Sequence, residues 1–237
     1  MFSIPNTIEA ATEQAQAATQ AAIQAGLTRL QIEMVIPELK QQPIAEQFLA
    51  VFQELGLAFK VYFADAGAAA LAKRDWDNPD FSIRGINEIK GQPDTEDEAF
   101  LVINPSAVEV SEVEKLCEAA LDRPVVLLNP KLEDVATIGI GYAGRQLRER
   151  FLSKLESCYY LRPLEGAAIF RCYPQPWQVW QETESGDYTL LSEFPQRPTS
   201  EAIERILSAD TADQAAGASP KRGFLGELQQ FIRALTQ

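Results

Sequence analysis

The sequence predicts an α/β fold in which a mainly parallel sheet with flanking helices is extended by a C-terminal antiparallel meander. Three observations predict it. Short, almost wholly apolar runs alternate with amphipathic segments through the first half of the chain, as parallel strands buried on both faces require. Several of these runs end next to a proline, which stops a strand. Beyond residue 157 the pattern changes to an alternation of period two, which is typical of antiparallel strands.

The first predicted helix begins at a capping-box pattern, Asn6 followed by Glu9, and ends at Gly26. Its apolar positions recur at three- and four-residue spacing and are mostly alanine, so we expect close packing. These positions are Ile8, Ala11, Ala15, Ala18 and Ala22. We then expect strands at residues 30–36, 59–63, 100–104 and 125–129, and helices at residues 45–55, 68–74 and 111–121.

A helix over residues 145–157 is expected to lead into the meander, with strands at residues 158–162, 167–173, 177–182 and 188–193. One face of this meander carries Ala168, Phe170 and Cys172. We expect residues 1–208 to form a single α/β domain. Residues 209–222 read as a flexible linker, and residues 223–237 as an amphipathic C-terminal helix.

Composition excludes several classes of function. The 237 residues carry 21 basic and 34 acidic side chains, a net charge of −13, which disfavours nucleic acid and anionic lipid as partners. Histidine is absent, which removes the usual general base of serine and cysteine hydrolases and the imidazole ligands of zinc sites. No apolar run approaches the roughly 20 residues that span a bilayer, so we expect no integral membrane segment and a cytoplasmic location.

The three cysteines, Cys117, Cys158 and Cys172, are widely spaced in apolar or aromatic sequence and read as reduced core residues. The acidic run over residues 75–80 lacks the glycine and distal glutamate of a calcium loop, and no phosphate-binding P-loop motif occurs. We therefore assign no metal and no cofactor.

Three predicted strands end with a proline in similar positions, at Pro37, Pro105 and Pro130. The carboxyl ends of parallel strands meet at one edge of a sheet, where ligands bind in open α/β folds. Asn-Pro is also ordinary turn chemistry, so this pattern alone assigns no role to the loops.

A candidate anion site follows the glycine-rich residues 139–144. This string matches the dinucleotide-binding pattern, but the strand that we expect before it ends well upstream, at Asn129. The helix after it begins with arginines, and residues 145–171 carry a net charge of +3 in an acidic protein. Arginine side chains and free N–H groups at a helix start suit phosphate or carboxylate, so we predict anion binding by Gly141, Gly144, Arg145 and Arg148. Ion pairing with neighbouring glutamates is the alternative.

A second candidate surface is aromatic and apolar. Trp177 and Trp180 of the meander, with Phe224, Leu228 and Phe231 of the C-terminal helix, are predicted to bind a partner protein. Packing of the tryptophans within the core, and docking of the helix on its own domain, are the alternatives.

Residues 29–39, the block of residues 125–164 with Asn129-Pro130, and residues 171–177 together resemble the domain-of-unknown-function 1995 family of cyanobacteria and chloroplasts. That family includes assembly factors of the low-photosystem-II-accumulation type and domains appended to some chloroplast adenylate kinases. The resemblance covers most of residues 20–205 and implies a photosynthetic context. It brings no catalytic motif, and the absence of a transit peptide and of a kinase domain suggests a cyanobacterial cytoplasmic member without kinase activity.

Two functions follow from these observations. The sequence favours a non-catalytic accessory or assembly protein in a photosynthetic context that binds a partner protein. The alternative is an α/β small-molecule binder or enzyme that acts on an anionic, phosphorylated or similar, ligand at the Arg145 region.

Overall fold

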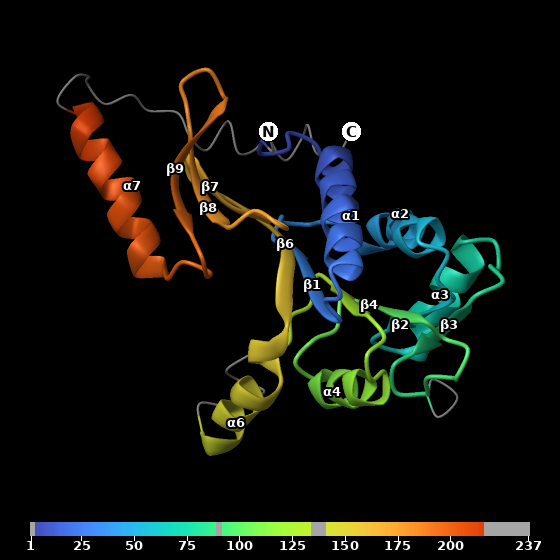
Figure 1. Ribbon diagram of the computed structural model, residues 1–237. Coiled ribbons are helices and arrows are strands. Elements are labelled where there is room, and N and C mark those ends of the chain that lie inside the picture. Colours follow the sequence, from blue (N-terminus) through green and yellow to red (C-terminus); the bar gives the residue numbers. More distant parts are fainter. Residues whose placement is uncertain (1–2, 89–91, 134–140, 216–237) are drawn as a thin grey trace.

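The computed structural model describes residues 3–88, 92–133 and 141–215, and these form one nine-stranded mixed sheet with six α-helices around it (Figure 1). The strand order is β3-β2-β4-β5-β1-β6-β7-β8-β9. The strands are β1 (Arg29–Met34), β2 (Phe59–Phe63), β3 (Ser82–Gly85), β4 (Ala99–Ile103), β5 (Val125–Leu128), β6 (Glu156–Leu164), β7 (Ala167–Cys172), β8 (Trp177–Glu182) and β9 (Tyr188–Phe194). The helices are α1 (Ile8–Gln24), α2 (Gln41–Glu54), α3 (Ala66–Asp75), α4 (Val110–Ala119), α6 (Tyr142–Arg150) and α7 (Ser200–Ala215).

The predicted fold class is confirmed. Strands β3, β2, β4, β5, β1 and β6 run parallel, and β6 to β9 form the antiparallel meander. Helices α1, α2 and α3 pack on one face of the sheet, whereas α4 and α6 cover the parallel half of the other face (Figure 1). Because both faces are covered, β4 and β5 are buried at every position, as their apolar sequences predict.

Helix α1 confirms the alanine stripe but corrects the cap. Its N-cap is Thr7, whose hydroxyl accepts a hydrogen bond from the Ala10 N–H at 3.1 Å, so the cap lies one residue after the predicted Asn6. The stripe residues Ala11, Ala15, Ala18 and Ala22 are all buried. Their small side chains let α1 approach α2 and the sheet closely. Gly26 follows the helix at φ +84°, a backbone conformation that glycine adopts without strain.

Two predicted elements differ in extent. The helix expected over residues 145–157 is α6, which spans Tyr142–Arg150. A 3-10 turn at Leu152–Lys154 follows it, and the chain is extended from Glu156 because β6 pairs with β1 from that point. Helix α7 covers residues 209–215, which read as linker in the sequence. The alanines of this stretch have the highest helix propensity of all residues, and its two aspartates lower that propensity too little to end the helix. The rest of the predicted linker and the predicted C-terminal helix lie outside the described residues.

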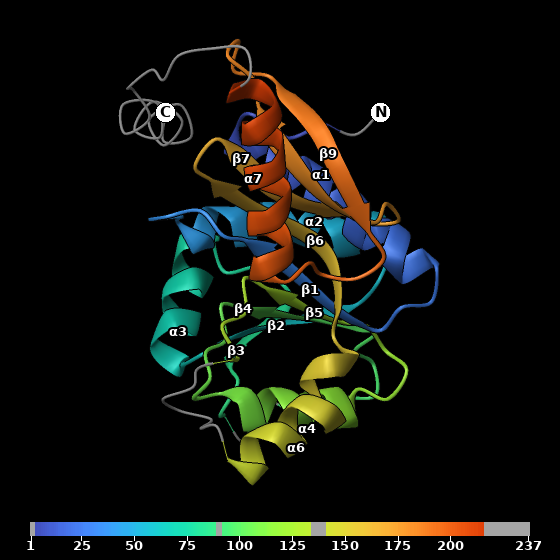
Figure 2. The same ribbon diagram turned by 90° about the vertical axis from the view of Figure 1, so that its left-hand side faces the viewer.

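The meander lies between two helices, with α1 on one face and α7 on the other (Figures 1 and 2). As predicted, Ala168, Phe170 and Cys172 share a face and join the core under α1. The opposite face forms a smaller cluster of Tyr160, Ile169 and Trp177, against which Ile203 of α7 packs. No helix in the described part of the chain is long and apolar enough to cross a membrane.

The interpretation of the cysteines as reduced core residues is confirmed, because all three are free and buried. Burial raises the pKa of the Cys117 and Cys158 thiols to about 12 and that of Cys172 to about 11. The thiols are therefore protonated and unreactive at neutral pH.

Candidate functional site

A cavity of about 590 Å³ opens at the carboxyl ends of β1 and β5, and its size is within the usual range for small-molecule sites. The chain leaves β1 toward α2, on one face of the sheet, but leaves β5 toward α6, on the other face. The cavity lies between these two strand ends. Open α/β sheets bind ligands at such switch points.

Two of the three proline-terminated strand ends noted in the sequence form walls of this cavity. Residues 35–39 follow β1, with Pro37 and a Glu38 at φ +57° before α2, and Pro130 follows β5. The start of α2 completes this side of the cavity through Gln41. The N-cap of α2, Lys40, makes no side-chain cap, and the first turn carries no acidic residue, so the positive end of the helix dipole is not neutralised there.

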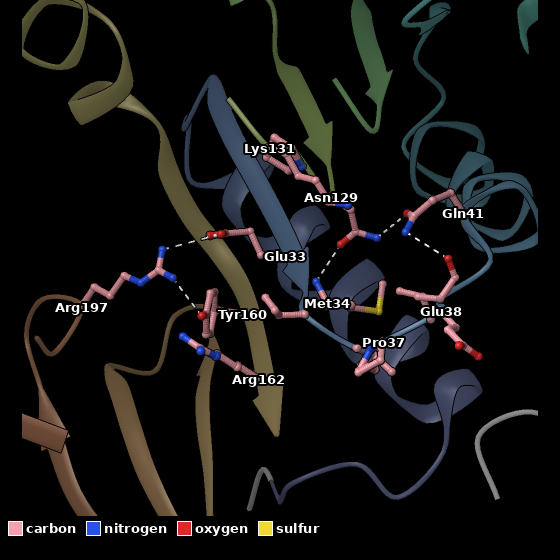
Figure 3. Close-up of a pocket in the computed structure, with 14 residues that line it drawn as sticks. Glu33, Met34, Pro37, Glu38, Gln41, Asn129, Lys131, Tyr160, Arg162 and Arg197 are labelled. Carbon is pink, nitrogen blue, oxygen red and sulfur yellow. Dashed lines mark hydrogen bonds and ion pairs between the residues drawn. The ribbon is translucent and has the colours of Figure 1, made fainter. Parts of the chain in front are cut away.

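Asn129 joins the three elements that meet at the cavity (Figure 3). Its Oδ1 accepts a hydrogen bond from the Met34 N–H of β1 at 2.7 Å, and its Nδ2 donates to Oε1 of Gln41 at 2.6 Å. The residue is 6% exposed and has a positive φ of 50°, a conformation that asparagine tolerates better than most residues. A residue before proline is usually extended, so the left-handed backbone of Asn129 before Pro130 is an exception to this preference. Asn129 fixes the start of α2 against the strand ends.

On the opposite side, Glu33, Tyr160 and Arg197 form a connected group (Figure 3). Arg197 lies on the connection between β9 and α7. Its Nη2 donates to the Tyr160 hydroxyl at 2.8 Å, and its Nη1 lies 3.6 Å from Oε1 of Glu33. The guanidinium also lies over two aromatic rings, 4.4 Å from the centre of Tyr160 and 5.6 Å from that of Trp177.

Burial raises the pKa of the Glu33 carboxyl above its usual range, and this effect outweighs the opposing effects of Arg197 and the Ser157 hydroxyl. Only 16% of the Glu33 side chain is exposed, so its ionised form is costly for the fold, and such groups gather at functional sites. Glu33 thus marks this cavity as a candidate site on grounds independent of its shape.

An irregularity in strand pairing places Tyr160 beside Glu33. Gln31 pairs with Ser157, but the register shifts after it, so Glu33 pairs with Tyr160 and not with Tyr159. Side chains alternate between the two faces of a strand. Without this shift, Glu33 would pair with Tyr159, and the Tyr160 ring would not lie directly beside Glu33. Sequence reasoning missed Glu33 and Arg197 because this shift and the position of the β9–α7 connection both depend on contacts between distant segments.

The remaining walls combine positive charge with apolar surface. Lys131 and Arg162 line the cavity with exposed side chains, and neither forms an ion pair with another of the described residues. The apolar wall consists of Met34, Val35, Ile36, Pro37, Leu39 and Pro130. Val35 is 44% exposed, which is high for a large apolar side chain at the end of a core strand. The cavity is therefore lined by the cations Lys131, Arg162 and Arg197, by the carboxylates Glu33 and Glu38, and by this apolar surface.

The sequence-predicted anion site lies elsewhere. Gly141 is the N-cap of α6 and Gly144 is buried inside that helix, while residues 134–140 lie outside the described residues. Arg145 is exposed in the second turn, and Arg148 lies 3.6 Å from Glu133. None of the four lines the cavity at β1 and β5. Their binding of an anion stays a prediction, and the alternative of ion pairing applies to Arg148.

The predicted partner surface also differs from the cavity. Trp177 is 6% exposed and packs on Tyr160, and Trp180 is 8% exposed and belongs to the core under α1. Little of either ring is therefore offered to a partner in this state. Phe224, Leu228 and Phe231 lie outside the described residues, so their role stays a prediction.

Fold and cavity together define an open α/β domain with a crevice at a topological switch point. The chain belongs to the DUF1995 family, a domain of unknown function, whose family model matches residues 5–205. This match includes every residue that lines the cavity.

Proposed function

We propose that this protein binds a small organic anion, one with an anionic head and an apolar body, in the cavity at the ends of β1 and β5. The observation that carries the proposal is the arrangement of the walls: Lys131 and Arg162 offer cationic side chains, and an apolar wall follows the end of β1. In a protein of net charge −13, free cations at a recess attract anions against the overall field.

The start of α2 supports the same ligand class. Gln41, the first residue of α2, lines the cavity, the N-cap Lys40 makes no side-chain cap, and Asn129 holds the helix start in place through Gln41. Pro43 carries no N–H, so the backbone donors of this start are those of Gln41 and Gln42. Such N–H groups favour a phosphate or carboxylate, in addition to the charge of the two side chains. Binding, and not catalysis, is the role that these groups support.

The proposal corresponds to the small-molecule alternative of the sequence analysis, at a different site. The accessory or assembly role in a photosynthetic context, with a protein partner, stays a prediction that rests on the family resemblance.

The test is titration with methyl, ethyl and n-butyl phosphate by calorimetry. We expect binding, with affinity increasing roughly fourfold for each methylene that the apolar wall buries, because one buried methylene contributes about 0.8 kcal/mol. The double variant Lys131→Gln/Arg162→Gln is expected to weaken n-butyl phosphate binding roughly tenfold or more, because charge-assisted hydrogen bonds contribute about 1.5–3 kcal/mol.

A matched control is available on α6. Arg145→Gln/Arg148→Gln removes the same charge from exposed or half-exposed positions away from the cavity, and is expected to leave binding unchanged. If this control loses binding while Lys131→Gln/Arg162→Gln retains it, the anion site is at α6 and the proposal is wrong. Absence of binding of all three phosphates to the wild type also refutes it.

A further inference from the structure

Arg197 is a wall residue of the cavity that does not belong to the sheet. It lies in the short connection between β9 and α7, and two residues later the hydroxyl of Thr199 accepts a hydrogen bond from the Ala202 N–H at 3.2 Å, in the first turn of α7. Only one residue therefore separates Arg197 from the capping residue of the helix. Half of the Arg197 side chain is exposed, and its contact with Glu33 is long, at 3.6 Å, so the guanidinium has room for another acceptor.

Over residues 200–208, helix α7 contacts the sheet through partly exposed side chains. Within residues 200–208 no side chain is fully buried, and the apolar residues that face inward are all partly exposed: Ala202, Ile203, Ile206 and Leu207. Ile203 packs on the cluster of Tyr160, Ile169 and Trp177. A helical segment whose apolar side chains are only partly buried, as in residues 200–208, opens at a lower free energy than the core of the domain. Figure 2 shows α7 lying across the meander strands, on the outside of the molecule.

We infer that Arg197 couples occupancy of the cavity to docking of α7. This inference rests on the proposed function. An anion that engages the Arg197 guanidinium adds a charge-assisted hydrogen bond that exists only while the β9–α7 connection is in place. The bound state then favours docked α7, and undocking of α7 removes a wall of the site. Coupling of this kind is reciprocal, so docking of α7 must strengthen anion binding by the same factor.

The experiment is hydrogen–deuterium exchange of residues 200–215, with and without n-butyl phosphate at ten times its dissociation constant. Exchange is expected to slow by at most about tenfold, the limit for a ligand that binds only the docked state at that concentration. Arg197→Gln is expected to abolish this slowing. Arg205→Gln, an exposed change of the same kind on α7, is the matched control and should keep it.

Reciprocity gives a second, independent measurement. Ile203→Ser weakens the docking of α7 without touching the cavity, because Ile203 does not line it. We expect this variant to bind n-butyl phosphate more weakly than wild type. Circular dichroism shows whether the variant is folded, and if it is not, the comparison of Arg197→Gln with Arg205→Gln decides.

The possible failures are distinguishable. If wild type does not bind n-butyl phosphate, the proposed function fails and the coupling with it. If wild type binds but exchange in residues 200–215 does not change, or if folded Ile203→Ser binds as wild type does, the cavity is a binding site and the coupling is wrong.

Discussion

Lys60 gives the sharpest test of the energetics of this fold. It lies on β2 at 2% exposure, and its ammonium lies 2.8 Å from carboxylate oxygens of both Asp94 and Asp97 and 2.9 Å from the Gln92 carbonyl oxygen. Lys60→Met keeps most of the apolar stem and removes the charge. Asp97, with 15% of its side chain exposed, is then left as a largely buried unpaired carboxylate. Breaking a buried pair costs about 3–5 kcal/mol, and the residual exposure of Asp97 places the expected loss near 3 kcal/mol.

For a domain of this size a loss of about 3 kcal/mol lowers Tm by roughly 6–12 °C. Urea denaturation followed by circular dichroism gives the free energy of unfolding, and calorimetry gives Tm. Adding Asp97→Asn to Lys60→Met removes the unpaired charge of Asp97 but keeps a side-chain oxygen that accepts the hydrogen bond from the Asp94 N–H. The double variant should therefore recover about half of the lost free energy of unfolding. Lys115→Met is the control, since Lys115 is exposed and lies 3.8 Å from Glu112. A loss below about 1 kcal/mol, or a double variant no more stable than Lys60→Met, refutes the reasoning.

Three further predictions follow from the site and the core. The pKa of Glu33 is raised above its unfolded value of 4.5, so the ionised form of Glu33 lowers the stability of the folded state at pH values above its folded pKa. Glu33→Gln should therefore raise Tm at pH 7 more than at pH 4. An equal rise in Tm at both pH values contradicts this. Asn129→Gly should lower the free energy of unfolding by about 1–3 kcal/mol, because two hydrogen bonds are lost. Asn129→Ala should lower it by more, because alanine is strained at the positive φ of this position. Urea titration measures both losses, and a larger loss for Asn129→Gly than for Asn129→Ala contradicts the reasoning. The three thiols should react with a disulfide reagent at pH 8 only after denaturant is added, and fast reaction of the native protein contradicts their burial.

Local patterns were enough to predict most of the fold. Apolar runs such as Val125–Leu128 indicate strands buried on both faces, and the change to period two marks the meander. Strand β3 was missed because Ser82–Gly85 is short and carries Arg84, so its strand character comes from pairing with β2. Helix α7 was missed because its apolar residues over 200–208 form only a weak stripe and are partly exposed.

The site was predictable only in part. The sequence indicated which edge of the sheet to inspect, since Pro37 and Pro130 do lie at the cavity, but it favoured the arginines of α6 as the anion site. Lys131 and Arg162 carry the same charge as Arg145 and Arg148, and nothing in the local sequence distinguishes them. The difference is that β5 and β6 flank β1 in the sheet, which brings Lys131 and Arg162 to one cavity from segments about 30 residues apart.

Asn104 and Asn129 show why strand order decides what a local motif does. Each directly follows a parallel strand, precedes a proline and has a positive φ, 49° and 50° respectively. Beside Asn129 lie the Met34 N–H and the Gln41 side chain, because β1 is the neighbour of β5 and leads into α2. The Oδ1 of Asn104 is buried and finds no hydrogen-bond partner among the described residues. The Asn129 side chain therefore joins β5 to β1 and α2, whereas the Asn104-Pro105 dipeptide contacts the next strand end through its backbone, with the Pro105 carbonyl accepting a hydrogen bond from the Lys131 N–H at 2.7 Å. Because the partner is supplied by a strand about 95 residues away in sequence, only the assembled sheet distinguishes the two.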